Sequence, residues 1–200
     1  TEFYQAGYNV FVLEYTVNPL DEAPLKLQPL KDISRAMRMI RFLAEQLHIL
    51  SDQIVVCGFS AGGHLCASLC VHGADIEDPD EKYQKFSNKP DAAVLSYPVI
   101  TSGKYAHRDS FVALLGKNST KKELEYMSIE KYVTKEIPPC FIWQTSQCSL
   151  IAPTVYTGVY SKSSVFLKFF KIFCLFFPLT FSGFSHIIIR KEGGRFIRDD

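Results

Sequence analysis

One pentapeptide of this 200-residue sequence combines the residue types and the spacing of a catalytic nucleophile. It follows the apolar run 54–57 and opens a stretch of small residues: Gly58-Phe59-Ser60-Ala61-Gly62, the pattern G-x-S-x-G. A strand, a sharp turn and a helix in that order hold a serine hydroxyl exposed above a sheet. The pattern predicts that Ser60 is a nucleophile with strained backbone dihedral angles. It also predicts that the backbone N–H of Ala61, at a helix N-terminus, stabilises an oxyanion.

The two glycines of the motif have a steric interpretation. We expect a turn so tight that a Cβ atom at Gly58 or Gly62 would strike neighbouring backbone. The alternative is an ordinary glycine-rich turn between a strand and a helix, without chemistry.

The segments around the motif alternate between strand-like and helix-like patterns. Apolar runs predict strands over 8–15, 54–57, 92–99 and 140–145, with a turn at 51–53. Apolar spacing and a capping box at Thr120 predict helices over 32–47, 61–71 and from Thr120 through Tyr132. Such alternation is typical of a mostly parallel sheet with flanking helices, the α/β class. We expect one core to contain apolar residues of several strands: Val10, Val12, Val55, Val94, Leu95 and Ile142.

Length and composition limit the function classes. Two hundred residues suit a single domain with its own core. A net charge of +1 and a pI near 7.6 argue against a nucleic-acid partner. Six cysteines without a C-x-x-C spacing do not form a disulfide scaffold, so reduced thiols are expected. The first residues lack the basic and apolar regions of a signal peptide, and a cytoplasmic location is expected.

Residues 3–145 resemble the α/β-hydrolase esterase/lipase family, and most closely its acetylesterase branch, which includes bifunctional acetylxylan/feruloyl esterases. The resemblance rests on five segments in the family's order: VLEYTVNP, APLKLQPLKDISRAMRMIRFLAEQ, IVVCGFSAGGHLCASL, PDAAVLSYPVIT and PPCFIWQT. It implies a partial α/β-hydrolase fold and hydrolysis of carboxylic esters through an acyl-enzyme on Ser60. It also implies a small-molecule ester substrate and neither a cofactor nor a metal.

The sequence departs from the family's pattern at two places. The family's HGGG-type loop, which donates a second oxyanion N–H, would lie before Thr1. The triad acid is expected just after Thr145, but no Asp or Glu occurs from Gln144 to Lys191. His186 is the single histidine after His107 and is therefore the candidate base. We expect residues 1–145 to form a partial α/β-hydrolase domain that lacks the N-terminal oxyanion-loop region. The alternative is a truncated or degenerate, non-catalytic fragment.

The last part of the chain, 146–200, is a divergent, Phe-rich tail. Nine of the sixteen phenylalanines lie there, without a period of two or 3.6 residues. Three interpretations are open: an irregular segment such as follows an altered reading frame, a buried strand–helix unit, or a membrane contact through the uncharged stretch 172–189. We expect the tail to be irregular and to pack incompletely.

Two further clusters resemble metal sites. His64, Cys66, Cys70 and His72 fall in one helix, but their directions around it do not converge on one ion. We expect two buried thiols and two histidines on a polar face. The acidic run 75–81 lacks the spacing of an EF-hand loop and is expected to be a solvated loop.

Overall fold

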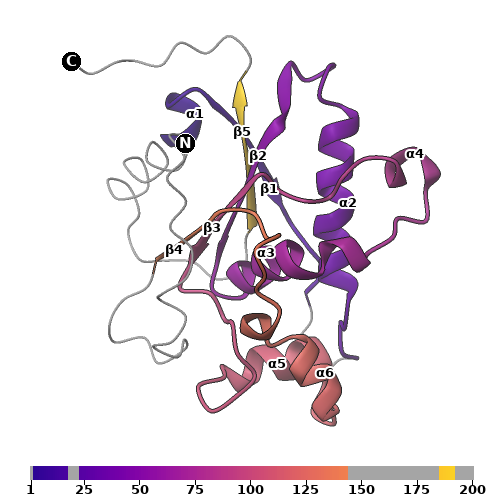
Figure 1. Ribbon diagram of the computed structural model, residues 1–200, viewed down its shortest axis with the longest axis vertical. Helices are drawn as coiled ribbons and strands as arrows, with labels where there is room; N and C mark the ends of the chain where they lie inside the picture. Colours follow the sequence, from indigo (N-terminus) through magenta and orange to yellow (C-terminus); the bar gives the residue numbers. More distant parts are fainter. Residues whose placement is uncertain (1, 18–22, 144–184, 192–200) are drawn as a thin grey trace.

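The computed structural model describes residues 2–17, 23–143 and 185–191, with a sheet of five strands between helices (Figure 1). The strands are β1 (Tyr8–Leu13), β2 (Ile49–Phe59), β3 (Ala92–Ser96), β4 (Cys140–Trp143) and β5 (Ser185–Lys191). The helices are α1 (Glu2–Gln5), α2 (Gln28–Phe42), α3 (Ala61–His72), α4 (Glu81–Gln84), α5 (Arg108–Leu115) and α6 (Lys121–Tyr126), with short 3-10 turns η1 (Gly73–Asp75) and η2 (Ile129–Lys131).

The strand order is β1-β5-β2-β3-β4. β2, β3 and β4 are parallel, and helical segments connect them in the chain, which confirms the predicted α/β class. β5 is antiparallel to both of its neighbours, β1 and β2, so that β1 and β2 run in the same direction with β5 between them.

The described residues form three apolar clusters rather than the single core that we expected: two share the sheet, and a third holds Val99, Phe111, Leu115 and Met127. Successive side chains of a strand point to opposite faces, so Val55 and Val56 of β2 belong to different clusters. Of the two clusters that share the sheet, one holds residues of α2 and α3, and the other holds Phe3 of α1. The prediction was wrong for Val12, which is 56% exposed. Of the remaining expected core residues, Val94 and Val10 lie with Val55, and Leu95 and Ile142 lie with Val56.

Several element boundaries differ from the sequence prediction. Helix α2 begins four residues earlier than expected because Pro29 lies in its first turn, where a missing N–H costs nothing. The turn predicted at 51–53 lies inside β2, where the pairing with β5 shifts register between Ile49 and Ile54. The helix after Thr120 has the predicted capping box but ends at Tyr126.

Residues 146–184 and 192–200 of the tail lie outside the described residues, and so does most of the stretch 172–189 considered for a membrane contact. The expectation of an irregular tail was wrong for 185–191, which form a strand. The seven residues of β5 form a strand in the middle of the described sheet (yellow in Figure 1). Among the helices that the structure describes, none has the length and apolar character needed to cross a membrane.

Candidate active site

The G-x-S-x-G motif forms a sharp turn between β2 and α3. Strand β2 ends at Phe59 and helix α3 begins at Ala61, so Ser60 alone makes the turn. Its φ of 52° and ψ of −116° lie in a region that residues with a side chain rarely adopt. The predicted backbone strain at Ser60 is confirmed, and such strain is typical of a residue positioned for chemistry.

Backbone hydrogen bonds hold the strained serine from both sides. The N–H of Ser60 donates to the carbonyl of Ser96, at the end of β3, over 3.0 Å. The carbonyl of Ser60 accepts from the N–H groups of His64, at 3.0 Å, and Val99, at 3.2 Å. The turn is therefore fixed to the carboxyl end of the neighbouring strand as well as to its own helix.

The structure explains the first glycine of the motif. A Cβ atom on Gly58 would lie 2.2 Å from the carbonyl oxygen of Gly62 and 2.8 Å from the Sγ atom of Cys66. A further close approach occurs at Gly63, where a Cβ atom would lie 2.8 Å from the Cβ atom of Pro98. The steric expectation for Gly58 is confirmed, and Gly62 contributes the backbone that excludes the Cβ atom.

Ala61 occupies the position that the oxyanion prediction requires. It is the first residue of the twelve-residue helix α3, and the first N–H groups of a helix have no partner within it. The helix dipole adds a partial positive charge at this end. Ala61 is exposed and Ser60 is half-buried, so a substrate carbonyl can approach both.

His186, the candidate base, lies in β5. Its backbone pairs with Val12 of β1 and with Cys57 of β2, three residues before Ser60. β5 begins at Ser185 opposite Gly58, so the first residues of β5 lie at the same end of the sheet as Ser60. The expected acid position after Thr145 lies outside the described residues.

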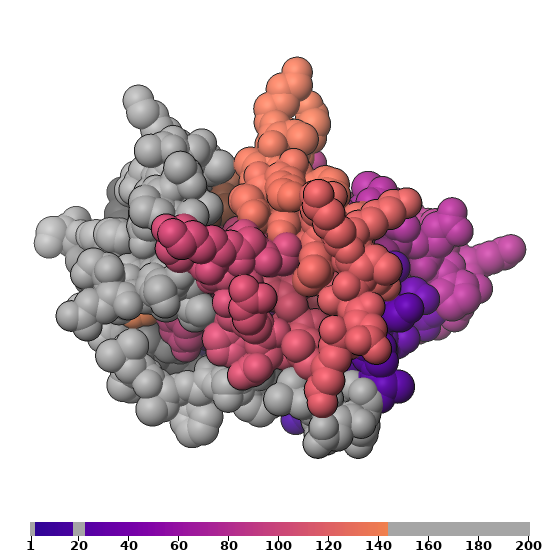
Figure 2. All heavy atoms as spheres, turned by 90° about the horizontal axis from the view of Figure 1, so that it is seen from below, coloured from indigo at the N-terminus to yellow at the C-terminus, as the bar shows by residue number. Residues whose placement is uncertain are grey.

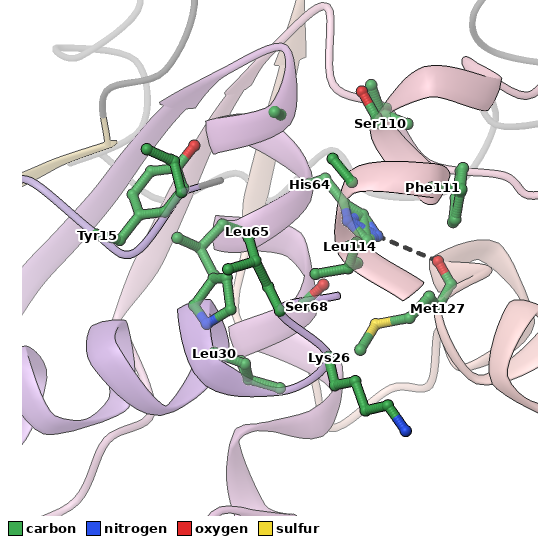
Figure 3. A pocket seen from close by; sticks show the side chains of 16 residues that line it. Tyr15, Lys26, Leu30, His64, Leu65, Ser68, Ser110, Phe111, Leu114 and Met127 are labelled. Carbon is green, nitrogen blue, oxygen red and sulfur yellow. Dashed lines mark hydrogen bonds between the residues drawn. The ribbon is translucent and has the colours of Figure 1, made fainter. Parts of the chain in front are cut away.

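A cavity of about 200 Å³ is lined in part by Ala61, the residue that follows Ser60. Figure 3 shows ten of its lining residues with labels. One wall is the face of α3 that carries Ala61, His64, Leu65 and Ser68, at the i, i+3, i+4 and i+7 positions of a helix. The rest of the lining comes from three regions and two further residues. Tyr15, Val17, Leu25 and Lys26 lie between β1 and α2, Pro29 and Leu30 lie at the start of α2, and Ser110, Phe111, Ala113 and Leu114 lie in α5. The two further residues are Val99 and Met127. Figure 2 shows the surface formed by the segment that carries α5 and α6.

The two histidines of α3 are buried, which corrects the expectation of a polar face. The Nε2 atom of His64 lies 3.1 Å from the carbonyl oxygen of Met127, and that of His72 lies 2.8 Å from the carbonyl oxygen of Tyr126. Burial, and secondarily the neighbouring His72, lowers the pKa of His64 from 6.5 to about 4. Burial also lowers the pKa of His72. Sequence reasoning missed these roles because the partner segment is more than fifty residues away.

The acidic run 75–81 is only partly solvated, contrary to expectation. The Asp78 side chain is 3% exposed and accepts two hydrogen bonds from the Arg35 guanidinium. Burial works against the charge of Asp78, but the hydrogen bonds from Arg35 and from the N–H of Asp80 lower its pKa overall. This carboxylate is therefore a structural ion-pair partner that joins α2 to the loop before α4.

Comparison with known proteins identifies the family. The BD-FAE family profile matches residues 1–157. The chain belongs to the BD-FAE family. Endo-1,4-beta-xylanase B of Butyrivibrio fibrisolvens is 51% identical over 150 residues, which are 75% of this chain and 24% of the relative. Acetylxylan esterase of Xylanibacter ruminicola is 26% identical over 163 residues, 80% of this chain and 31% of the relative. The chain thus spans about a quarter to a third of these relatives.

Solved structures of ester hydrolases share the fold of this chain. An acetyl ester-xyloside bifunctional hydrolase from Caldicellulosiruptor lactoaceticus aligns with a TM-score of 0.55 and 38% identity, over 58% of this chain and 43% of that one. A truncated carbohydrate esterase from gut microbiota shares the fold, with a TM-score of 0.52 and 23% identity over 64% of this chain and 52% of that one. The predicted resemblance to α/β-hydrolase esterases is confirmed.

Proposed function

We propose that this chain carries the nucleophile of a carboxylic ester hydrolase and that Ser60 forms the acyl-enzyme. The observation that carries the proposal is the strained turn at Ser60, which the Gly58–Gly62 contact and three backbone hydrogen bonds hold in place. A strained backbone conformation persists only where several surrounding contacts hold it, and strained turns of this kind position nucleophilic serines.

The reaction follows from the position of Ser60 beside the α3 N-terminus. The Oγ atom attacks the acyl carbon and its proton passes to a histidine, for which His186 is the candidate. The N–H of Ala61 stabilises the oxyanion of the tetrahedral intermediate. The bond to the alcohol then breaks and the histidine returns the proton to the leaving oxygen. Water attacks the acyl-enzyme in the same manner and releases the carboxylic acid and the free serine.

The names of two relatives support ester hydrolysis as the reaction of this chain. The acetylxylan esterase and the acetyl ester-xyloside hydrolase both bear an acetyl ester in their names. Neither a cofactor nor a metal takes part in this scheme, and a small-molecule ester is the proposed partner.

A second candidate is a non-catalytic fragment that keeps the strained turn without a working triad. The observation in its favour is the absence of Asp and Glu from 144 to 191, where the triad acid is expected. Loss of the acid's control over the histidine costs about four orders of magnitude in turnover.

An activity-based probe separates the two candidates. The intact mass of the protein is measured after incubation with a fluorophosphonate, which phosphonylates activated serines and releases fluoride. Single labelling would support the esterase if Ser60→Ala abolishes it and Ser119→Ala leaves it intact, since Ser119 does not line the cavity. No labelling would support the fragment. A gain of hydrolysis in Gln147→Asp would identify the acid as the missing component.

A further inference from the structure

The cavity extends along helix α3 from the N-terminal end of the helix. Its wall on α3 starts at Ala61, the residue whose N–H is placed to hold the carbonyl oxygen of the substrate, and continues through Leu65 to Ser68. In Figure 3 the Leu65 and Ser68 side chains of α3 lie on one side of it and Leu114 of α5 lies near His64. The cavity therefore begins where the carbonyl group of an ester would lie and extends away from it along the helix.

Five of the sixteen lining residues carry polar side chains, and three of these, His64, Lys26 and Ser110, have partners within the protein; the Oγ atom of Ser110 lies 2.9 Å from Nδ1 of His107. His64 is bonded to the carbonyl of Met127, and the Nζ atom of Lys26 lies 3.7 Å from the carboxylate of Glu123 on α6. Most of the remaining lining is aliphatic or aromatic. A sugar placed here would leave several hydroxyls without partners, which is costly in an apolar site. The occupant is therefore apolar.

The volume sets the size of the occupant. An apolar cavity of about 150 Å³ in another protein holds a benzene molecule. The cavity here has about 200 Å³. The methyl group of an acetyl ester would fill only a small part of it, whereas a chain of about six carbon atoms would occupy most of it.

We propose that this cavity is an acyl-binding pocket that selects esters of apolar acids with about six carbon atoms. The proposal rests on the proposed esterase function of Ser60. It departs from the acetyl group in the names of the relatives. Because each buried methylene group contributes about fourfold to binding, four additional methylenes raise kcat/KM on the order of a hundredfold.

Two isomeric esters test which side of the substrate enters the cavity. Ethyl hexanoate and hexyl acetate have the same atoms, so their overall hydrophobicity is closely matched, and ethyl acetate is the reference. We expect kcat/KM for ethyl hexanoate to exceed that for ethyl acetate by tenfold or more and to exceed that for hexyl acetate. Equal values for the three esters, or a preference for hexyl acetate, would overturn the proposal while leaving the esterase function standing.

Variants of α5 test the location. Ala113 lines the cavity, and Ala113→Leu fills part of it; the expected result is a tenfold or larger fall in the ratio of kcat/KM for ethyl hexanoate to kcat/KM for ethyl acetate. Leu114→Ala enlarges the cavity and is expected to move the preference to longer acids. Val112→Leu on the same helix is the matched control, since Val112 does not line the cavity. A hexanoate preference that survives in Ala113→Leu would place the acyl chain elsewhere.

A binding measurement separates this proposal from the esterase function. Calorimetric titration of the Ser60→Ala variant with hexanamide and with acetamide requires no catalysis. Tighter binding of hexanamide, weakened in the double variant with Ala113→Leu, supports the pocket even if the wild-type chain hydrolyses no ester. Equal, weak binding of both amides argues against the pocket, whatever the outcome of the probe labelling.

Discussion

The imidazole of His64 lies 3.1 Å, measured at Nε2, from the carbonyl oxygen of Met127, the residue that follows α6. Two turns later on α3, His72 makes the equivalent contact with the carbonyl of Tyr126, and its ring stacks on the Tyr126 ring with centroids 4.0 Å apart. The last carbonyls of a helix have no partner within it. The two buried imidazoles therefore provide hydrogen-bond partners for carbonyl groups at the end of α6. They also hold Met127, which lines the cavity, in place.

Stability should depend on pH through His64. Its pKa of about 4 in the folded state lies below the value near 6.5 of the unfolded chain, so the unfolded state binds more protons between these values. The contribution is fully present above pH 6.5 and is lost as the pH falls through about 4. Its size is on the order of 3 kcal/mol. Urea unfolding at pH 7, 6, 5 and 4 measures it.

A variant of His64 tests whether this residue causes the pH dependence of stability. His64→Gln keeps an amide donor but has no titratable group, so the fall in stability between pH 6.5 and 4 should be smaller than in the wild type. His72, whose pKa burial also lowers, accounts for part of the remaining slope. An unchanged pH profile in His64→Gln would contradict the assignment.

Gly58→Ala should destabilise the fold by about 3 kcal/mol or more. The added Cβ atom would lie 2.2 Å from the carbonyl oxygen of Gly62, and backbone at the start of a helix cannot move aside cheaply. Gly7→Ala is the matched control, because Gly7 has a φ of 85° but open space around it. Its cost should be only the strain of a left-handed conformation, about 1–2 kcal/mol. Equal losses in the two variants by thermal unfolding would show that steric exclusion at Gly58 is unimportant.

The sequence predicted the parts of the structure that local sterics and periodicity determine. The two glycines of the turn at Ser60 are four residues apart, and the Thr120 and Glu123 side chains of the capping box are three residues apart. Both features can therefore be recognised in a short stretch of sequence. The burial of His64 and Asp78 was not predictable in this way. Their partners, Met127 and Arg35, lie 63 and 43 residues away in the chain, and only the folded arrangement brings them together.

Val12 and β5 illustrate a second limit. Apolar residue type alone placed Val12 in the core, but which residues of a strand are covered depends on what packs against each face. For β5, the run of Ile187, Ile188 and Ile189 suits a strand, yet no local signal tells which two strands it joins. Long-range pairing of this kind is decided by the sheet as a whole.

Asp78→Asn should lower stability by about 1–3 kcal/mol at neutral pH, since it removes the charge that accepts two hydrogen bonds from Arg35. The folded-state pKa of Asp78 is below its ordinary value, so its contribution is present above pH 4 and is lost as the pH falls further. The wild type should therefore lose its advantage over the variant in acid. Asp80→Asn, which keeps an oxygen acceptor for the Lys82 N–H, is the control. A difference between wild type and Asp78→Asn that is independent of pH would contradict the ion-pair assignment.

The position of β5 makes a prediction for hydrogen exchange. In a strand with a neighbour on each side every N–H faces a partner strand, so the amides of 185–191 should exchange about as slowly as those of 54–58 in β2. Ile188 pairs with Val10 and with Val55, and Ile188→Pro removes an N–H from the middle of the sheet. That variant should lose about 3 kcal/mol or more, whereas Ile188→Val should be nearly neutral. Rapid exchange over 185–191, together with a proline variant as stable as the valine variant, would show that β5 does not join β1 to β2 in solution. It would also remove His186 from the strand beside Ser60, and the search for the base of the proposed reaction would then have to begin elsewhere.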